Sequence, residues 1–273
     1  MRLAASISRY PLESVVVTHA YGQLPFFKFT AVLDSVSDIE GTITLTVGDQ
    51  EYNVKAQGCD FMSLKDGRLS ANIGAIPDAA WVSDLERVRP MSFEDTELKD
   101  ILAFYGFACG DKFNASTNFI NVVHPDYVCV AALANMGNTF GLVDYENHKV
   151  VHRNDLLQAD PVQPYAGFRM TMQNTPSLGV MSSVPTMNLD APRNADLYLP
   201  GIPTNQSVTL YENLSRNYSE LSRLMARTQH CSPPEDYDLG TCMLSPLTMS
   251  RCIVVARSLT YTVSGCTRNY WCI

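Results

Sequence analysis

Residues 42–56 have the sequence TITLTVGDQEYNVKA. Ile43 and Leu45 alternate with threonines, and this period of two is typical of a strand that buries one face. Residues 48–50, Gly-Asp-Gln, supply a turn, and residues 52–56 follow as the partner strand. The segment therefore predicts a β-hairpin.

Three further segments around this hairpin have the composition of strands. Residues 14–18 are a β-branched run, SVVVT, and residues 26–33 and 69–73 are two more candidates. Short strands separated by turn signals favour a β-barrel or a β-sandwich. We therefore expect residues 1–91 to form the first part of a β-barrel domain.

The C-terminal end returns to the same pattern. IVVA at residues 253–256 leads into LTYTV at residues 259–263, Ser-Gly turns the chain, and residues 270–273 form the last strand. The final residue, Ile273, is apolar, so we expect the chain to end inside a sheet. Residues 154–273 are expected to complete the barrel domain.

Between these parts, residues 92–153 predict a small α/β insertion. A helix is expected from Ser92, its N-cap, to Gly106, just past its end. Glu94 and Asp95 fall in the first turn, where the helix dipole favours acidic side chains. The apolar face that supports this helix consists of Leu98, Ile101, Leu102 and Tyr105.

A second helix is expected to begin at Pro125-Asp126 and to run to Gly137 through the apolar stretch VCVAALA. Residues 140–144 and 150–151 then predict a hairpin around a turn at Glu-Asn-His. The predicted fold class is therefore α+β, mainly β, with a barrel that is interrupted by the small α/β insertion.

Residues 172–207 are rich in proline, serine, threonine and asparagine and have hardly any periodicity. A loop of this length is usually functional or disordered. Our hypothesis is an extended arm that becomes ordered against a partner, and a surface linker is the other interpretation. A helix is predicted after it, over residues 208–229, from an apolar stripe formed by Leu210, Leu214, Tyr218, Leu221 and Met225.

The charge of the chain argues against nucleic-acid binding. The formal net charge is -8, and we find no run of lysine or arginine. Binding to phosphates needs a cationic surface. No stretch approaches the roughly 20 apolar residues of a membrane span, and Arg9 and Pro11 interrupt the N-terminus too soon for a signal peptide. We therefore expect synthesis in a cytoplasm, no membrane span and no specific nucleic-acid binding.

Eight cysteines are many for a cytosolic chain of this size. None forms a C-x-x-C pair, which argues against a zinc knuckle or a thioredoxin-like site. Two interpretations stay open. The cysteines are small buried apolar side chains, or one or two disulfides form late, outside a reducing cell. Five of them crowd the C-terminal part: Cys231, Cys242, Cys252, Cys266 and Cys272.

The sequence contains no Gly-rich phosphate loop, no G-x-S-x-G elbow and no H-E-x-x-H. A Cys-His dyad of Cys129 or Cys109 with His124 is disfavoured, because Cys129 lies in an apolar predicted helix where a buried thiol is inert. His124 lies before Pro125 at a predicted helix start and can pair with Asp126.

The other histidines do not form a predicted site either. His148 and His152 are four residues apart, but the predicted turn falls between them and the hairpin does not align them as a helix would. His19 and His230 have no evident partners. We therefore predict no catalytic, cofactor-binding or metal-binding residues, no cofactor, and a protein that is not an enzyme.

The order of these parts resembles the baseplate hub proteins of phage tails and related contractile injection machines. Residues 26–33 are similar to the first long strand of their tail-tube-like barrel, and residues 92–151 to their helix, glycine and strand opening with its apolar helix and hairpin. Residues 254–265, VVARSLTYTVSG, are similar to their closing hairpin, although Tyr261 stands where histidine is common and residues 269–273 replace the last strand. The chain is shorter than typical hubs, so a second, smaller barrel is expected to be reduced or missing.

The resemblance implies a structural virion protein, located in the baseplate of a contractile tail. It implies a homotrimer, a ring that joins the six-fold tail tube to the three-fold central spike, with two barrel-like surfaces on each chain. The implied partners are the tail tube protein, the spike protein and other baseplate proteins. DNA would pass through the lumen without specific binding, and an acidic lumen would repel it. A tail adaptor or tube-initiator protein is a neighbouring role.

Two function classes outside this family stay open. A cytosolic β-barrel that holds a small ligand predicts a monomer with one apolar pocket and no long arm. An unrecognised hydrolase, such as a wall-degrading domain, predicts an acid and a nucleophile that share a pocket. The sequence shows no such pair, which counts against the hydrolase.

Overall fold

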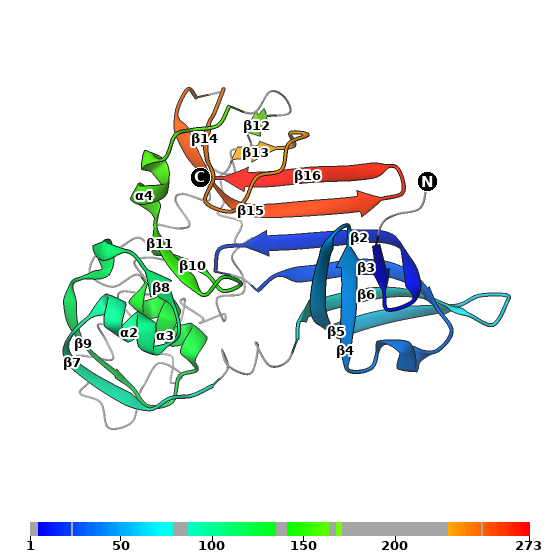
Figure 1. Cartoon of the computed structure of the whole chain (residues 1–273), viewed down its shortest axis with the longest axis horizontal. Helices are drawn as coiled ribbons and strands as arrows, with labels where there is room; N and C mark the ends of the chain where they lie inside the picture. The colour runs from blue at the N-terminus through cyan, green and yellow to red at the C-terminus, as the bar shows by residue number, and fades with distance from the viewer. Residues whose placement is uncertain are drawn as a thin grey trace.

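Six antiparallel strands close into a small β-barrel, the strand ring, in the N-terminal part of the protein (Figure 1). The computed structural model describes residues 5–22, 24–78, 87–134, 141–163, 168–170, 229–246 and 248–273. The ring has the order β1-β4-β5-β6-β3-β2, and β1 pairs back onto β2. Its elements are β1 (Ala5–Ile7), β2 (Tyr10–Ala20), β3 (Phe26–Leu33), the short 3-10 helix η1 (Val36–Ile39), β4 (Thr42–Val47), β5 (Gln50–Ser63) and β6 (Leu69–Pro77).

The strands predicted for this part are confirmed, and so is the alternation of the β4–β5 hairpin. Ile43 in β4 pairs with Val54 in β5, and both are buried together with Leu45. Phe27 and Phe29 of β3 also point inward, and each is only 1% exposed. Because buried side chains from all six strands meet inside the ring, its interior is a packed core.

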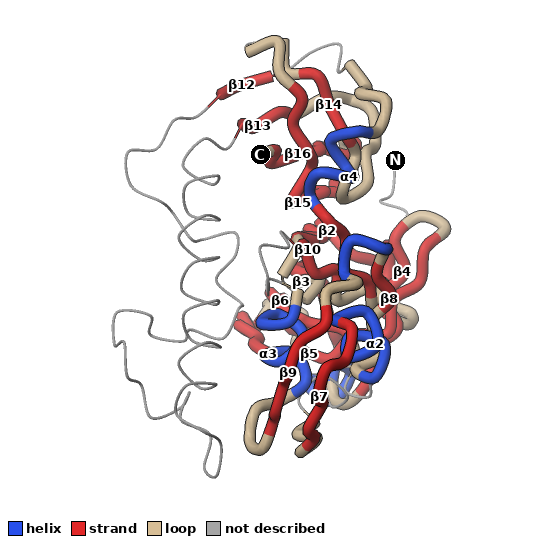
Figure 2. The backbone as a smooth tube through the Cα atoms, turned by 90° about the vertical axis from the view of Figure 1, so that its left-hand side faces the viewer, coloured by secondary structure: helices blue, strands red, loops and turns tan. Residues whose placement is uncertain are grey.

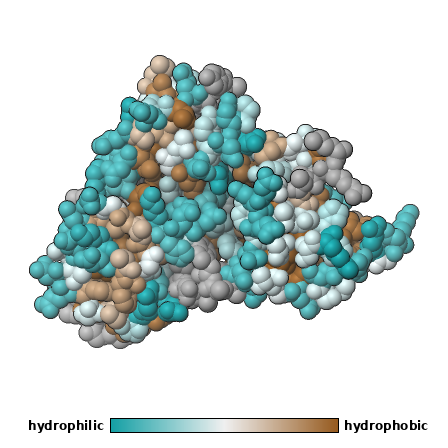
Figure 3. All heavy atoms as spheres, in the orientation of Figure 1, coloured by the Kyte–Doolittle hydropathy of each residue, from teal (hydrophilic) through white to brown (hydrophobic). Residues whose placement is uncertain are grey.

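β5 and β6 form a hairpin that extends past the ring (Figure 1). β4 pairs with residues 50–55 of β5, whereas β6 pairs with β5 as far as Ser63. Among the described strands, residues 58–63 of β5 therefore have one free hydrogen-bonding edge. Phe61 and Met62 on this segment are 39% and 62% exposed. Figure 3 shows hydrophobic atoms at the surface behind the hydrophilic tip of the hairpin.

The chain then forms an α/β unit with two small sheets of its own (Figure 1). One sheet has the order β10-β11-β8, and the other pairs β7 with β9. These sheets and two helices enclose a separate core around the buried rings of Phe107 and Phe113. The elements are β7 (Met91–Glu97), α2 (Leu98–Phe104), β8 (Ala108–Cys109), η2 (Asp111–Phe113), β9 (Ser116–Asn121), α3 (Asp126–Leu133), β10 (Gly141–Asp144), β11 (Lys149–His152) and α4 (Arg153–Gln158).

The helix predicted to begin at Ser92 begins only at Leu98. The prediction is wrong for the first residues of this helix, because they belong to the strand β7. This strand places Phe93 opposite Phe119 of β9. Both aromatic rings pack against the core of the unit, and this burial outweighs the cap-like sequence. The irregular pairing that follows holds Asp95 at φ 45°, a left-handed conformation that a right-handed helix excludes.

The other predictions for this unit are confirmed where the structure describes them. The apolar face of α2 is buried, and Gly106 follows the helix with φ 85°. α3 occupies the predicted second helix, although Gly137 lies outside the described residues. β10 and β11 form the predicted antiparallel hairpin and pair Val143 with Val150.

Five strands later in the chain enlarge the sheet of the ring. They are β12 (Phe168–Met170), β13 (Gln229–Cys231), β14 (Cys242–Leu244), β15 (Arg251–Thr262) and β16 (Gly265–Cys272). β15 pairs with residues 14–20 of β2, whereas β1 pairs with Tyr10 and Pro11. We expected residues 154–273 to complete the barrel, but the ring closes through β1 and these strands add to the sheet outside it. β1 is short, so it leaves most of one edge of β2 to β15.

In Figure 2, β12, β13 and β14 gather at one end of the molecule together with α4, and β7 and β9 lie towards the opposite end. The strands predicted at residues 253–256 and 259–263 are one continuous strand, β15. The end of the chain lies in the sheet as expected, since Ile273 and Ile253 exchange backbone hydrogen bonds of 2.9 and 3.0 Å.

Two predictions fall on other parts of the chain. The proline-rich arm at residues 172–207 and the helix at residues 208–228 lie outside the described residues. Gln229, given as the last residue of that helix, is instead the first residue of β13. Among the helices that the structure describes, none has the length and apolar character needed to cross a bilayer.

Candidate functional site

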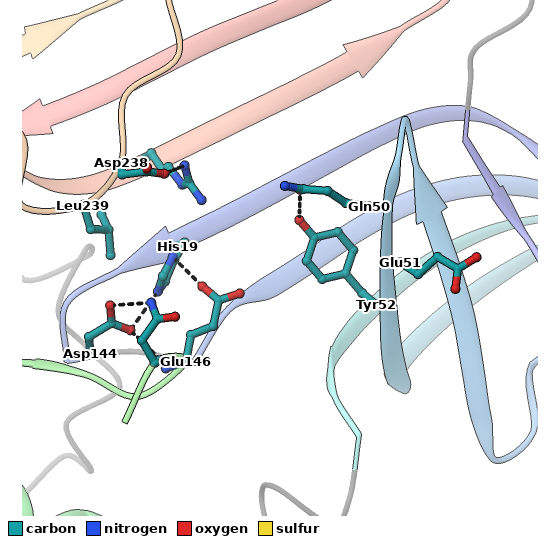
Figure 4. A pocket seen from close by; sticks show the side chains of 10 residues that line it. His19, Gln50, Glu51, Tyr52, Asp144, Glu146, Asp238 and Leu239 are labelled. Atoms are coloured by element: carbon teal, nitrogen blue, oxygen red, sulfur yellow. Dashed lines mark hydrogen bonds and ion pairs between the residues drawn. The ribbon is translucent and has the colours of Figure 1, made fainter. Parts of the chain in front are cut away.

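A buried histidine lies between two carboxylates where the ring meets the α/β unit (Figure 4). His19 comes from the end of β2, Asp144 from the end of β10, and Glu146 from the turn after β10. Nδ1 of His19 is 2.9 Å from Oε2 of Glu146, and Nε2 is 3.5 Å from Oδ1 of Asp144. The imidazole is 5% exposed and the Asp144 side chain 10%, whereas Glu146 reaches solvent.

Backbone hydrogen bonds fix the end of β2 in this position. The Gly22 amide donates to the Val143 carbonyl at 2.7 Å, and the Tyr21 amide donates to the Val255 carbonyl at 3.0 Å. The same short segment is therefore tied to β10 on one side and to β15 on the other. Gly22 has φ 73°, which lets the chain turn there without strain.

Asp144 is oriented by its own turn. Its Oδ1 accepts hydrogen bonds from the amides of Glu146 and Asn147, both at 3.1 Å. Its Oδ2 accepts one from the Asn147 side-chain amide at 2.8 Å. His148 closes the turn with φ 47°. The sequence DYENH thus forms an Asx-type turn that aims the carboxylate at His19.

The charges of this group support one another. Burial opposes ionisation of Asp144, but the imidazole and the hydrogen bonds from Asn147 hold the pKa of this carboxyl below its ordinary value. Burial likewise lowers the pKa of His19, and the carboxylates of Asp144 and Glu146 outweigh it, so the pKa of the imidazole is raised. Burial also raises the pKa of the neighbouring Tyr21, so its hydroxyl stays neutral.

A cavity of about 520 Å³ opens onto this group. Four parts of the chain line it: the end of β2, β5, the β10–β11 turn and the C-terminal region. Arg257 on its wall pairs with Asp238 at 2.8 Å, and the Tyr52 hydroxyl donates to Gln50. The complete lining is His19, Gln50, Glu51, Tyr52, Asp144, Glu146, Asn147, Asp238, Leu239 and Arg257.

The chemistry of the lining favours cation binding over nucleophilic attack. Four carboxylates line the cavity and one guanidinium does, so the wall has an excess of negative charge. Serine, threonine and cysteine are absent from the ten lining residues. Within the described residues, His19, Asp144 and Glu146 are also the one group of potential metal ligands whose donor atoms lie within 4.8 Å of one another.

The sequence prediction for His19 was wrong, because this histidine does have partners. They lie far along the chain, and no local pattern in the run SVVVTHA pointed to them. The only signal was a titratable side chain at the end of a strand whose other residues alternate between buried and exposed.

The structure does not bring the other titratable candidates into a site. The Cys129 thiol donates to the backbone carbonyl of His124 at 3.8 Å, and burial raises the pKa of this thiol to about 12. Cys129 is therefore a protonated thiol in a core. Asp126, which was expected to pair with His124, forms an ion pair with Arg89. The rings of His148 and His152 pack against different aromatic residues, Phe107 and Phe113.

All eight cysteines are free thiols in the structure. Five of them are buried, as small apolar side chains are expected to be. Cys231, Cys252 and Cys272 lie in one apolar cluster with Met243 and Tyr270. The Cys272 thiol there donates to the sulfur of Met243 at 3.8 Å.

No protein-family model and no curated protein matches the sequence. Solved structures do match the fold along the whole chain. A 43 kDa tail protein of prophage MuSo2 from Shewanella oneidensis has a TM-score of 0.59 at 11% identity, and the match covers 100% of this chain and 96% of that protein. A tail protein from Neisseria meningitidis MC58 has a TM-score of 0.59 at 10% identity, covering 99% and 95% of the two chains.

A third match comes from a secretion machine. It is a component of the E. coli type VI secretion system with structural similarity to the T4 bacteriophage tail proteins gp27 and gp5. Its TM-score is 0.59 at 7% identity, and the match covers 98% of this chain and 76% of that protein. The resemblance drawn from the sequence is therefore confirmed at the level of the fold, and this chain has the mainly β fold of phage tail proteins.

Proposed function

We propose that this chain is a structural component of a tail, a baseplate hub that assembles into a ring and joins the tail tube to the central spike. The observation that supports this role is the match in fold over nearly the whole length of two tail proteins. In this proposal the partners are further copies of the chain, the tail tube protein, the spike protein and other baseplate proteins. Its location is the virion or an equivalent injection particle.

The free edge of β5 is the surface that we assign to assembly. Exposed strand edges pair readily with other chains, and natural proteins usually shield or charge them. Here residues 58–63 carry Phe61 and Met62 at the surface next to that edge. Phe26 on β3, which pairs with β6, is 42% exposed, and its ring lies close to Gly74 of β6. A ring requires such a surface on each copy, because its interfaces are heterologous.

The proposal assigns no enzymatic activity to the chain. Serine, threonine and cysteine are absent from the ten residues that line the cavity, and both ring nitrogens of His19 face carboxylates at 2.9 and 3.5 Å. The packed core inside the strand ring supports a wall-forming role over that of a barrel that holds a small ligand.

The assembly surface is tested by the mass of the purified full-length chain, measured by light scattering during size exclusion over a range of concentrations. We expect a trimer, and we expect Met62→Glu to shift it towards the monomer because a charge would be buried at the interface. Met249→Glu is the matched control, since Met249 is an exposed methionine in the loop between β14 and β15. If the wild type is a trimer and both variants remain trimers, the hairpin is not part of the interface.

A further inference from the structure

We propose that His19, Asp144 and Glu146 bind one divalent transition-metal ion, and that this ion fastens the strand ring to the α/β unit. The site does not depend on the proposed tail function. His19 belongs to β2 of the ring, and both carboxylates belong to the β10–β11 hairpin. An ion bound by all three therefore crosslinks two parts of the chain that have separate cores.

The distances fit a metal centre. Zinc binds imidazole nitrogen and carboxylate oxygen at about 2.0–2.2 Å, so neighbouring ligand atoms of a tetrahedral site are about 3.4 Å apart. Nε2 of His19 and Oδ1 of Asp144 are 3.5 Å apart. One donor atom from each of the three residues lies within 4.8 Å of the others. Glu146 is 37% exposed, so its carboxylate has room to turn towards the ion.

The second observation is the state of the imidazole. Neither ring nitrogen of His19 has a hydrogen bond of good geometry, although the side chain is 5% exposed. A buried polar atom without a well-aligned hydrogen bond is costly. The carboxylate oxygens lie near these nitrogens but are not aligned with the ring as acceptors. Coordination of an ion by one ring nitrogen and by both carboxylates would give that nitrogen a partner.

The surroundings also favour a cation. The cavity gives an ion a path from solvent to the three side chains (Figure 4). Its wall carries two further carboxylates, Glu51 and Asp238, and its one guanidinium is already paired with Asp238. A negatively lined cleft raises the local concentration of cations.

The donor set indicates the class of metal. An imidazole with two carboxylates suits zinc and similar transition metals, whereas calcium and magnesium prefer oxygen ligands throughout. Three protein ligands leave a coordination position for water. Because metal affinity for the folded state adds to its stability, the bound ion is expected to raise the unfolding temperature.

The test uses the full-length chain, purified with a chelator and a thiol reductant and then freed of chelator. Zn²⁺ is titrated by calorimetry, and the unfolding temperature is measured with and without Zn²⁺. We expect one ion per chain, and an affinity reduced by about ten-fold or more in Glu146→Gln. Glu51→Gln is the matched control, since it makes the same change in the same cavity outside the three ligands. Zn²⁺ should raise the unfolding temperature of the wild type and of Glu51→Gln more than that of Glu146→Gln.

His19→Gln provides a second variant and is expected to abolish binding, provided that circular dichroism shows it folded. Co²⁺ in place of Zn²⁺ reports the ligand type, because cysteine ligands would add a thiolate charge-transfer band. Such a band would show that the thiols bind the ion, and this would overturn the proposal. The proposal is equally wrong if folded wild type binds no Zn²⁺, or if wild type and Glu146→Gln bind it equally well.

Discussion

Arg89 and Asp126 form an ion pair in which two guanidinium nitrogens contact a single carboxylate oxygen. Nε of Arg89 donates to Oδ2 of Asp126 at 2.8 Å, and Nη2 lies 2.7 Å from the same atom. Nη1 donates to the Phe104 carbonyl at the end of α2 at 2.9 Å. The guanidinium also lies 4.6 Å from the Phe104 ring centre and 5.0 Å from that of Tyr105. The Arg89 side chain, from the segment before β7, thus contacts both the end of α2 and the start of α3.

Loss of this arginine is expected to destabilise the unit strongly. Arg89→Met leaves the Asp126 side chain, which is only 3% exposed, without its counter-charge. Breaking such a buried pair costs about 3–5 kcal/mol. The control is Arg68→Met, whose pair with Asp66 is half exposed and is screened by solvent, so its loss should cost far less. Denaturant unfolding of both variants measures the difference, and equal losses would contradict the role given to Arg89.

Phe26 and Phe27 are neighbours that face opposite sides of β3. Phe27 is 1% exposed and packs inside the strand ring, so Phe27→Ala should cost about 3–5 kcal/mol through lost burial and the cavity left behind. Phe26 is 42% exposed, and Phe26→Ala should cost about 1 kcal/mol. The free energy of unfolding of each variant checks this. A larger loss for Phe26→Ala than for Phe27→Ala would contradict the prediction.

Gly141 is needed where α3 ends against β10. A methyl group added there would lie 2.3 Å from the carbonyl oxygen of Ala134, which accepts a 3.0 Å hydrogen bond from the Gly141 amide. Gly141→Ala must therefore push backbone apart, and we expect a loss of about 1–3 kcal/mol. Gly58→Ala in β5 is the comparison, because a methyl group there meets nothing within 4 Å. Thermal unfolding of both variants measures the two losses. If Gly141→Ala is as stable as the wild type, α3 can shift to make room for the methyl group.

His152 should make the protein less stable in mild acid. Burial first, and then the nearby Lys112, lower the pKa of this imidazole below its unfolded value of 6.5. The unfolded chain therefore binds a proton more readily, so this contribution to stability is complete above about pH 6.5 and falls as the pH drops towards the folded pKa. Protonation of Nδ1 also removes the acceptor for the Asn154 amide that caps α4.

The variant His152→Asn separates this effect from those of other groups. Asparagine keeps a capping oxygen but does not titrate. We expect the difference in unfolding free energy between about pH 7.5 and about pH 5.5 to be smaller in the variant than in the wild type. Because His19 is present in both proteins, its own titration cancels from the comparison. Identical pH dependences would show that His152 is not the group responsible.

Sequence patterns located most strands and the helices α2 and α3 of the α/β unit, because these depend on local burial. Ile43 and Leu45 are inward-facing as their alternation required, and the apolar face from Leu98 onwards is buried. The pattern failed at Phe93, where pairing with Phe119 of another strand outweighed a local cap signal. Long-range pairing decides such cases, and a single sequence carries little trace of it.

The site was beyond sequence reasoning for the same reason. His19 and Asp144 meet only because the end of β2 is hydrogen-bonded to β10 through Gly22 and Val143. The closure of the ring through β1 was missed as well, since three residues of strand carry almost no periodic signal. The family resemblance was found because it rests on the order of elements, which local patterns do reveal.

Electron cryo-microscopy of the full-length chain, alone and mixed with candidate tail tube and spike proteins, tests the central claim most directly. We predict a closed ring with three-fold symmetry, in which the β5–β6 hairpin of each copy contacts the next. A chain that stays monomeric at every concentration and in every mixture would contradict it.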